Sequence, residues 1–197
     1  MENQGECCHH GVDEPSEWVV KAAQLIPSGA SALDLACGGL RHARFLASRG
    51  CTVVAVDCRP RPAAAAFGPW TERIEYRQTD LEDGSWPLGE EAFDAIVVTN
   101  YLHRPLYPYI AAALRPGGLL AYETFAVGNE AYGRPMRPEF LLRPGELAKA
   151  FAVTLDVLAH EQVHVQVPRP AVVQRLLARR VAFNAPMGGH GREHVRC

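Results

Sequence analysis

Two acidic residues and a glycine-bearing turn have the types and spacing of a nucleoside-binding site. Asp34 lies in a short apolar run, Cys37-Gly38-Gly39 follows that run, and Asp57 ends a second apolar run. A turn without bulky side chains lets a ligand approach the backbone, and the N–H groups that open the next helix attract electron-rich atoms. A carboxylate at the tip of the second strand accepts hydrogen bonds from both hydroxyls of a ribose. These residues therefore predict a site for a nucleoside cofactor.

The glycine pattern favours one nucleoside cofactor over another. A dinucleotide site uses G-x-G-x-x-G to pack a pyrophosphate, and this turn offers only Gly38 and Gly39. Asp34 precedes the turn, where a carboxylate suits an ammonium or sulfonium ligand. The turn therefore favours S-adenosylmethionine over NAD, and an NAD-dependent reductase is the less favoured alternative.

The elements that position these residues alternate between strands and helices, as in a doubly wound sheet. Each apolar run is short, bounded by turn residues and followed by a helical pattern, which is typical of parallel strands joined by crossover helices. Ligands in such sheets bind beyond the carboxyl ends of the strands. The pattern predicts strands over 31–36, 52–57, 73–78, 93–99 and 119–125, and helices over 13–26, 41–48 and 105–114, with a short helix through the alanines at 63–66.

Several segments together resemble class I S-adenosylmethionine-dependent methyltransferases. ALDLACGGLRHARFLA is similar to the first motif of that family, and TVVAVD to its second strand with the ribose-binding acid. RQTDLEDGSWPL resembles the exit of the third strand, FDAIVVTN the fourth strand, and ALRPGGLLAYETF the turn and fifth strand. NYLHRPL and EFLLRPGEL are similar to segments of small bacterial proteins that are loosely related to tellurite-resistance methyltransferases. The resemblance covers nearly the whole chain.

This resemblance implies a fold, a cofactor and a set of binding residues. The fold is an α/β, doubly wound, Rossmann-like sheet of seven mostly parallel strands, in which 153–165 and 171–181 are the last two and the final strand is antiparallel. The cofactor is S-adenosylmethionine, its product is S-adenosylhomocysteine, and the acceptor is a small molecule. The cofactor-binding residues that it indicates are Asp34, Ala36, Cys37, Gly38, Gly39, Asp57, Cys58, Asp80, Leu81 and Asn100.

Residues after the fourth strand are the candidates for catalysis. In the family's geometry this strand ends nearest the transferable methyl group, and here it is followed by Asn100, Tyr101 and His103. Asn100 or Tyr101 would orient a nucleophile, and His103 would accept its proton. A helix-capping or packing role is the alternative for His103, because many methyl transfers need no base.

The candidates for substrate contact lie at the fifth strand and after it. Glu123 ends that strand, with a structural ion pair as the alternative role. The irregular segment 126–146 is long enough for a lid or a binding loop. Its Arg134 and Arg137, together with Arg143, would hold an anionic substrate or simply solvate the loop.

One residue departs from the family pattern. Similar sequences read A-C-G-x-G-R-H where this chain has Leu40 in place of the last glycine. A leucine there adds a side chain where the backbone approaches the cofactor and the helix packs on the strand. Gly39 would relieve this by shifting the turn by one residue. Without that shift cofactor binding would be weak, which leaves a non-catalytic family member as a further alternative.

Composition limits the remaining classes of protein. At 197 residues the chain suits one domain, predicted over 13–184 between flexible tails at 1–12 and 185–197. The formal net charge of −2 gives no reason to expect nucleic acid as a partner, and no apolar run reaches membrane length. Six cysteines without C-x-x-C spacing predict reduced thiols and a cytoplasmic protein. We expect a monomer or a homodimer. Cys7-Cys8-His9-His10 lacks the spacing of a closed metal site, so we expect no metal.

Overall fold

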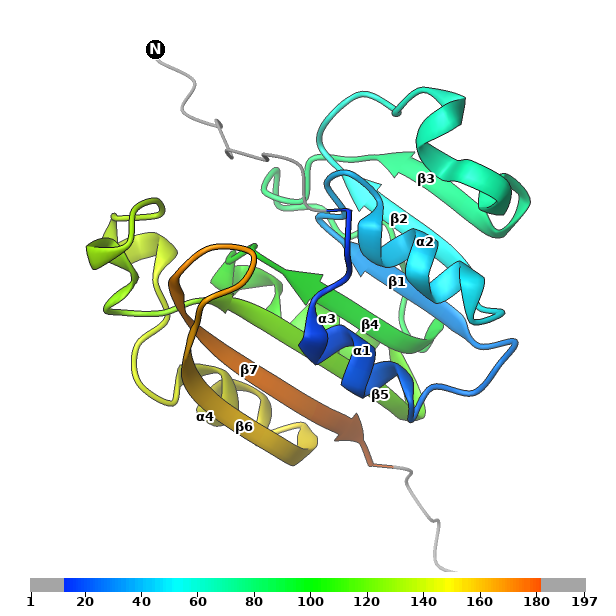
Figure 1. Ribbon diagram of the computed structural model, residues 1–197. Coiled ribbons are helices and arrows are strands. Elements are labelled where there is room, and N and C mark those ends of the chain that lie inside the picture. The colour runs from blue at the N-terminus through cyan, green and yellow to red at the C-terminus, as the bar shows by residue number, and fades with distance from the viewer. Residues whose placement is uncertain (1–12, 182–197) are drawn as a thin grey trace, which may run out of the picture.

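The seven strands form one sheet in the order β3-β2-β1-β4-β5-β7-β6 (Figure 1). Strands β1 to β5 are parallel, whereas β7 lies antiparallel between β5 and β6. The structure, a computed structural model, describes residues 13–181. The strands are β1 (Ser31–Leu35), β2 (Thr52–Asp57), β3 (Ile74–Gln78), β4 (Phe93–Thr99), β5 (Leu114–Phe125), β6 (Leu155–Val165) and β7 (Ala171–Arg180).

Helices cover both faces of this sheet (Figure 1). α1 (Glu17–Ala23), α2 (Arg41–Ser48) and the 3₁₀ segment η1 (Ala64–Arg73) pack on one face, and α3 (Tyr107–Ala113) and α4 (Glu146–Phe151) on the other. Three shorter 3₁₀ turns connect the elements: η2 (Arg104–Leu106), η3 (Asn129–Ala131) and η4 (Pro138–Phe140).

The alternation of side chains along each strand divides the core into two clusters. In β1, Ala32 packs under α1 and α2, whereas Leu33 and Leu35 pack under α3 and α4. In β4, Val97 belongs to the first cluster, and Ile96 to the second. Because strand neighbours point to opposite faces, Asp34 points toward α1 and α2. The acid that precedes the turn is thus placed beside the first helix after it.

The predicted fold class is confirmed, including the antiparallel last strand. The run at 171–181 also has features of a short helix, but it forms β7 and pairs on both sides. The helix predicted over 13–26 is shorter, at Glu17–Ala23, and two further differences are larger. Strand β5 begins five residues early, at Leu114, and the alanine segment forms a 3₁₀ helix that Gly68 interrupts at φ 59°. The predicted tails, the end of the predicted domain at 184 and the residues Cys7 to His10 lie outside the described residues.

Candidate functional site

The site lies at the carboxyl edge of the sheet, where the strand order reverses between β1 and β4. Neighbouring crossovers leave in opposite directions at such a point and open a crevice beyond the strand ends. The turn after β1, Asp57 at the end of β2 and Asn100 after β4 all lie at this edge. The fold therefore brings together the residues that the sequence indicated for the cofactor.

Asp57 is held by donors on both carboxylate oxygens. Oδ2 accepts a hydrogen bond from the Gly38 N–H at 2.8 Å, which ties the turn after β1 to the tip of β2. Oδ1 accepts from the backbone N–H and Nε of Arg59 at 3.1 and 2.9 Å, and Arg59 Nη2 reaches Oδ2 at 3.2 Å. Burial opposes ionisation of this carboxyl, but the bonds from Arg59 and Gly38 outweigh it and keep its pKa below the usual value. Asp57 is therefore a fixed carboxylate.

Asp34 is a buried acid with one of its two carboxylate oxygens free of hydrogen bonds to the described residues. Its Oδ2 accepts the Ala43 N–H at 2.9 Å, which anchors the first turn of α2 to β1. Among the described residues its Oδ1 has no hydrogen-bond partner. Burial raises the pKa of Asp34 to about 7, against the lowering effect of the Ala43 bond and of Arg41. A cation that approached this acid would favour its ionised form.

The turn after β1 keeps the backbone shape of a glycine-rich turn with fewer glycines. Ala36, Gly38 and Leu40 all adopt positive φ, at 54°, 57° and 68°. Gly39 does not, so Leu40 itself takes the left-handed conformation and the predicted one-residue shift does not occur. The Leu40 side chain is fully buried in the core cluster under α1 and α2. The leucine thus fills the core, and the turn remains free to face a ligand.

Arg41 is a polar residue of this edge that the sequence reasoning missed. Its electrostatic neighbours include Glu123 and Asp34, and burial lowers its pKa. Its guanidinium makes one long hydrogen bond, from Nη1 to the Glu14 carbonyl at 3.4 Å, and no ion pair with another described residue. Guanidinium has five N–H donors, so most remain available to an anion. The R-H pair after the turn was the signal in the sequence.

His42 joins three elements behind the site as a neutral ring. The Ser16 N–H donates to His42 Nε2 at 3.2 Å, so Nδ1 carries the proton and donates to Thr99 Oγ1, also at 3.2 Å. Burial, with a smaller effect of Arg41, lowers the pKa of His42 to about 3. The residue thus fixes the start of α1 and the end of β4 against α2.

We expect His42 to make folding stability fall in acid. The unfolded chain takes up this proton below pH 6.5 and the folded chain only near pH 3, so each pH unit between them costs about 1.4 kcal/mol. Urea unfolding should show the stability advantage of the parent over His42→Gln shrinking by about 2 kcal/mol between pH 7 and pH 5. Asp34 has the opposite slope, because its folded pKa is raised, but both proteins share it and the comparison cancels it. An advantage that does not change with pH would contradict the buried neutral ring.

The candidate catalytic residues border the same crevice from β4 and from the loop after β3. Asn100 has φ 54° and donates its backbone N–H to the Glu123 carbonyl. Burial and the neighbouring Glu82 raise the pKa of Tyr101, so its hydroxyl remains protonated. His103 Nδ1 lies 3.9 Å from Glu82 Oε2. Glu82 therefore links the two exits, although β3 and β4 are separated in the sheet by two strands.

The remaining cofactor candidates have ordinary local roles in the structure. Asp80 is exposed and its Oδ1 accepts the Glu82 N–H at 2.9 Å, whereas Leu81 is buried in the core under α3 and α4. Cys37 is buried, and burial together with Asp34 raises the pKa of its thiol. Cys58 is exposed and directs its Sγ toward Asp57 Oδ1 at 3.8 Å. The roles of these residues toward a cofactor remain predictions.

Glu123 belongs to a row of charged side chains across three strands. Arg175 of β7 donates from Nε to Glu123 Oε2 at 2.5 Å and from Nη1 to Glu161 of β6 at 3.0 Å. The guanidinium carbon of Arg175 also lies 5.8 Å from the centre of the Trp18 ring. Glu123 and Arg175 are both buried, so the pair fixes β5 against β7. This is the ion pair that the sequence left as the alternative role of Glu123.

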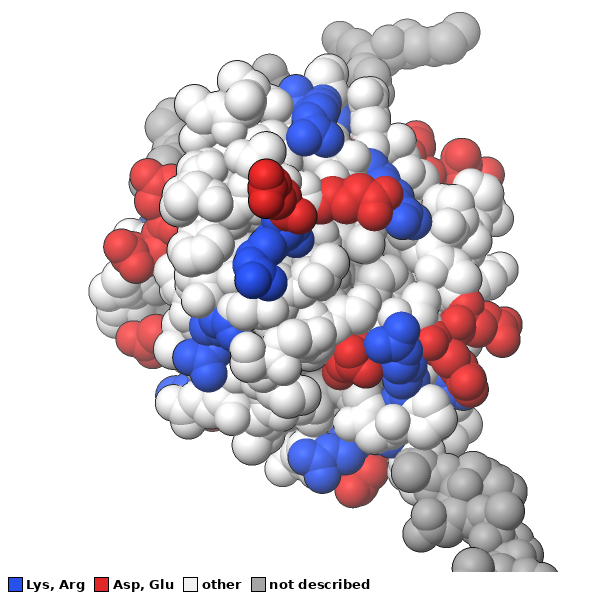
Figure 2. Space-filling view, turned by 90° about the vertical axis from the view of Figure 1, so that its right-hand side faces the viewer, with Lys and Arg blue, Asp and Glu red and all other residues white. Residues whose placement is uncertain are grey.

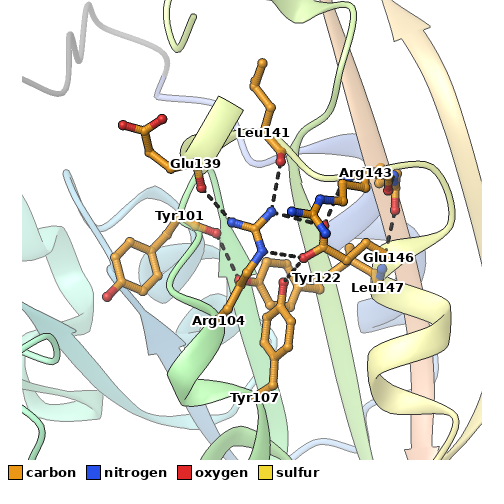
Figure 3. Close-up of polar contacts among 10 residues, drawn as sticks. Tyr101, Arg104, Tyr107, Tyr122, Glu139, Leu141, Arg143, Glu146 and Leu147 are labelled. Carbon is orange, nitrogen blue, oxygen red and sulfur yellow. Dashed lines mark hydrogen bonds and ion pairs between the residues drawn. The ribbon is translucent and has the colours of Figure 1, made fainter. Parts of the chain in front are cut away.

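Arg104 fastens the long loop after β5 to the exit of β4 (Figure 3). Its Nε and Nη2 donate to both oxygens of Glu146 at 2.6 and 3.0 Å, and its remaining N–H groups reach the carbonyls of Glu139 and Leu141. In Figure 3 the Tyr101 side chain points away from this cluster, while Tyr122 directs its hydroxyl to the Tyr101 carbonyl. Arg104 also lines a hollow of about 600 Å³ on the α4 side, together with Tyr107, Arg143, Pro144, Glu146, Lys149 and Ala150.

The other substrate candidates lie on the surface of the loop. Arg134 and Arg137 are exposed, and Arg137 Nη1 lies 3.7 Å from Glu139 Oε1. Arg143 is exposed and lines the hollow beside Lys149. The role of Arg134 and Arg137 toward a substrate stays a prediction.

The described residues show no large charged patch on the face in Figure 2, no membrane-spanning helix and no metal-ligating cluster. Figure 2, which views the right-hand side of Figure 1, shows acidic and basic side chains interspersed, with no continuous patch of either sign. Over 13–181 no helix has the length and hydropathy needed to cross a membrane, and no group of three metal-ligating side chains comes together.

Comparison with families of known proteins finds a match for the central part of the chain. Residues 32–118 match the model of a methyltransferase domain. The ubiquinone biosynthesis O-methyltransferase of Pseudomonas syringae pv. tomato is 31% identical over 123 residues, which cover 58% of this chain and 52% of that protein. The chain thus spans about half the length of the curated relatives that it matches.

Solved structures show the same fold. TehB from Haemophilus influenzae superposes with a TM-score of 0.69 at 19% identity, covering 84% of this chain and 62% of TehB. The 1,6-didemethyltoxoflavin-N1-methyltransferase of Burkholderia thailandensis, solved with S-adenosylhomocysteine bound, has a TM-score of 0.64 at 21% identity, covering 83% and 76%. The resemblance to methyltransferases that the sequence motifs indicated is confirmed.

Proposed function

We propose that this chain, whose residues 32–118 match a methyltransferase domain, is an S-adenosylmethionine-dependent methyltransferase that acts on a small-molecule acceptor. The observation that carries the proposal is the arrangement at the carboxyl edge. The turn after β1 presents its backbone, and its Gly38 N–H fixes Asp57, whose carboxylate suits a ribose diol. Asp34 and Arg41 lie beside them: Oδ1 of Asp34 is a buried acceptor without a partner among the described residues, and Arg41 has donors available for a carboxylate.

The mechanism that fits this site is alignment of the two reactants. S-adenosylmethionine supplies a methyl group that is already activated on sulfur, so the protein's task is to place a nucleophile in line behind it. Alignment alone can lower a barrier by roughly 7–11 kcal/mol. Tyr101 keeps its hydroxyl proton and can donate a hydrogen bond to an acceptor. In this proposal His103, whose Nδ1 lies 3.9 Å from Glu82 Oε2, takes a proton from the acceptor.

We assign Arg41 to the carboxylate of the cofactor's amino-acid end. Arg41→Met should weaken binding of S-adenosylhomocysteine about tenfold, because a charge-assisted hydrogen bond contributes about 1.5 kcal/mol or more. Binding of 5′-methylthioadenosine, which has no amino-acid end, should be unchanged by the same substitution. Calorimetric titration of both ligands measures this difference.

Arg44 provides the matched control for that substitution. It lies on the same helix, but its Nη2 pairs with Asp13 and its Nη1 with the Ala66 carbonyl, away from Asp34. Arg44→Met should leave the affinity for both ligands unchanged. Equal losses of the two ligands in Arg41→Met would refute a carboxylate contact and indicate a general disturbance of the turn.

We propose the methyl acceptor only as a chemical class, a small molecule. The names of these proteins indicate different acceptors, one in ubiquinone biosynthesis and the other 1,6-didemethyltoxoflavin. We therefore propose a small-molecule acceptor without naming it, in a cytoplasmic monomer or homodimer. The non-catalytic alternative rested on Leu40, and it loses its main support because that side chain fills the core rather than the turn.

Calorimetric titration with S-adenosylmethionine, S-adenosylhomocysteine and NADH tests the proposal. We expect micromolar binding of the two sulfur nucleosides and none of NADH, because the adjacent Gly38 and Gly39 do not make the G-x-G-x-x-G pattern of a dinucleotide site. Binding of NADH alone would instead support the reductase, and binding of no nucleoside would refute the cofactor assignment.

A further inference from the structure

The Arg59 side chain forms hydrogen bonds with both carboxylate oxygens of Asp57, which are the acceptors that a ribose would need. The carboxylate receives four N–H donors: the backbone groups of Gly38 and Arg59, and Nε and Nη2 of the Arg59 side chain; the Cys58 thiol is a weaker fifth donor, with Sγ 3.8 Å from Oδ1. A carboxylate has about four acceptor positions on its two oxygens, so this set fills it. A ribose brings two further donors, and two of the present ones must therefore leave.

The guanidinium is the group that can leave. The Gly38 N–H is fixed in the turn after β1. The backbone of the segment after β2 is also fixed, because the Tyr76 hydroxyl donates to the Arg59 carbonyl at 2.8 Å and Gln78 Nε2 to the Cys58 carbonyl at 3.3 Å. The Arg59 side chain is 45% exposed, whereas that of Asp57 is 9% exposed. The long arginine side chain can thus rotate into water while the carboxylate stays in place.

The geometry of the fork matches the ligand that would replace it. Arg59 Nε contacts Oδ1 at 2.9 Å, and Nη2 contacts Oδ2 at 3.2 Å. Two neighbouring ribose hydroxyls would likewise donate one hydrogen bond to each oxygen. We propose that Arg59 is an internal competitor of the cofactor ribose: in the empty protein it holds the carboxylate of Asp57 in place, and it must be displaced whenever a nucleoside binds. This inference rests on the proposed function, because it takes Asp57 as the ribose-binding acid.

Substitution of Arg59 tests the competition. Arg59→Met keeps the apolar stem and removes both donors, so S-adenosylhomocysteine should bind roughly three- to tenfold more tightly than to the parent, as expected when a partly exposed ion pair no longer has to be broken. Since this pair is partly exposed, salt weakens it, and the gain should shrink in 0.5 M salt. A purely structural role of Arg59 would give no gain and no such salt dependence.

Arg61 is the matched control, because it carries the same charge two residues later. Its guanidinium carbon lies 4.6 Å from the centre of the Phe67 ring, and within the part of the chain that the structure describes it makes no hydrogen bond or ion pair with Asp57. Arg61→Met should leave the affinity within twofold of the parent, which separates the competition from a general effect of net charge.

The outcomes distinguish this proposal from the proposed function. If the parent binds S-adenosylhomocysteine and Arg59→Met binds it equally or more weakly, the competition is refuted and the cofactor assignment stands. If only Arg59→Met binds S-adenosylhomocysteine, the competition is upheld and explains why the parent shows no binding. If both proteins are folded and neither binds, the ribose role of Asp57 is refuted and the competition with it.

Discussion

Replacing Asp57 by alanine should weaken the binding of S-adenosylhomocysteine by about thirtyfold. The substitution removes the acceptors for two ribose hydroxyls, and their combined loss costs on the order of 2 kcal/mol. The carboxylate is nearly buried and its pKa is held below the usual value, so it is ionised at neutral pH and available for charge-assisted hydrogen bonds. Calorimetric titration of the parent and of Asp57→Ala at pH 7.5 gives the difference.

Asp94 is the control, because it has the same kind of partners at the opposite edge of the sheet. Its Oδ2 accepts the Ser31 N–H at 2.8 Å and Nη1 of Arg115 at 3.0 Å. Asp94→Ala therefore removes a carboxylate that also joins a backbone N–H to an arginine, but far from the crevice. It should leave the affinity unchanged. A loss of equal size in both variants would mean that the effect of Asp57 passes through folding and not through the ribose.

Leu40 should matter for stability far more than for binding. Its side chain is fully buried, and Leu→Ala substitutions in cores cost about 2–5 kcal/mol. Its φ of 68° is unfavourable for a residue with a Cβ by roughly 1–2 kcal/mol, and glycine avoids that cost. We therefore expect Leu40→Ala to lower the unfolding free energy by about 3 kcal/mol, and Leu40→Gly to be about 1 kcal/mol more stable than Leu40→Ala.

The decisive result is which of the two variants, Leu40→Ala or Leu40→Gly, has the higher unfolding free energy. Urea unfolding at pH 7.5 measures their stabilities, and titration with S-adenosylhomocysteine shows whether each folded variant keeps the affinity of the parent. If Leu40→Ala were more stable than Leu40→Gly, the left-handed backbone conformation at position 40 would be contradicted. A large gain of affinity in Leu40→Gly would show that the leucine obstructs the cofactor, contrary to its place in the core.

The sequence predicted the strands well because their signals are local. Short apolar runs bounded by turn residues mark β1, β2 and β4, and the order of these runs, with the methyltransferase motifs, implied the sheet. The antiparallel β7 depended on the resemblance, because Leu176 and Leu177 beside arginines also fit a helix. The early start of β5 was missed, since Arg115-Pro116-Gly117-Gly118 is typical of a turn.

The pairing of charged side chains could not be predicted in the same way. Asp57 and Arg59 are two residues apart, but only the geometry of the segment after β2 shows that the guanidinium reaches both carboxylate oxygens. Glu123 and Arg175 are 52 residues apart and meet because β7 inserts beside β5. Arg41 begins α2, and it was overlooked because its electrostatic neighbours lie on two strands: Asp34 on β1 and Glu123 on β5. Such contacts depend on sheet register, which a local pattern does not specify.

The most direct measurement of the central claim is a crystal structure of the protein with S-adenosylhomocysteine. We expect the ribose hydroxyls on the two oxygens of Asp57, the Arg59 side chain turned away from them, and the amino-acid end beside Arg41 and Asp34. A ligand bound elsewhere would refute the cofactor site, and a ribose that leaves the Arg59–Asp57 pair intact would refute the competition.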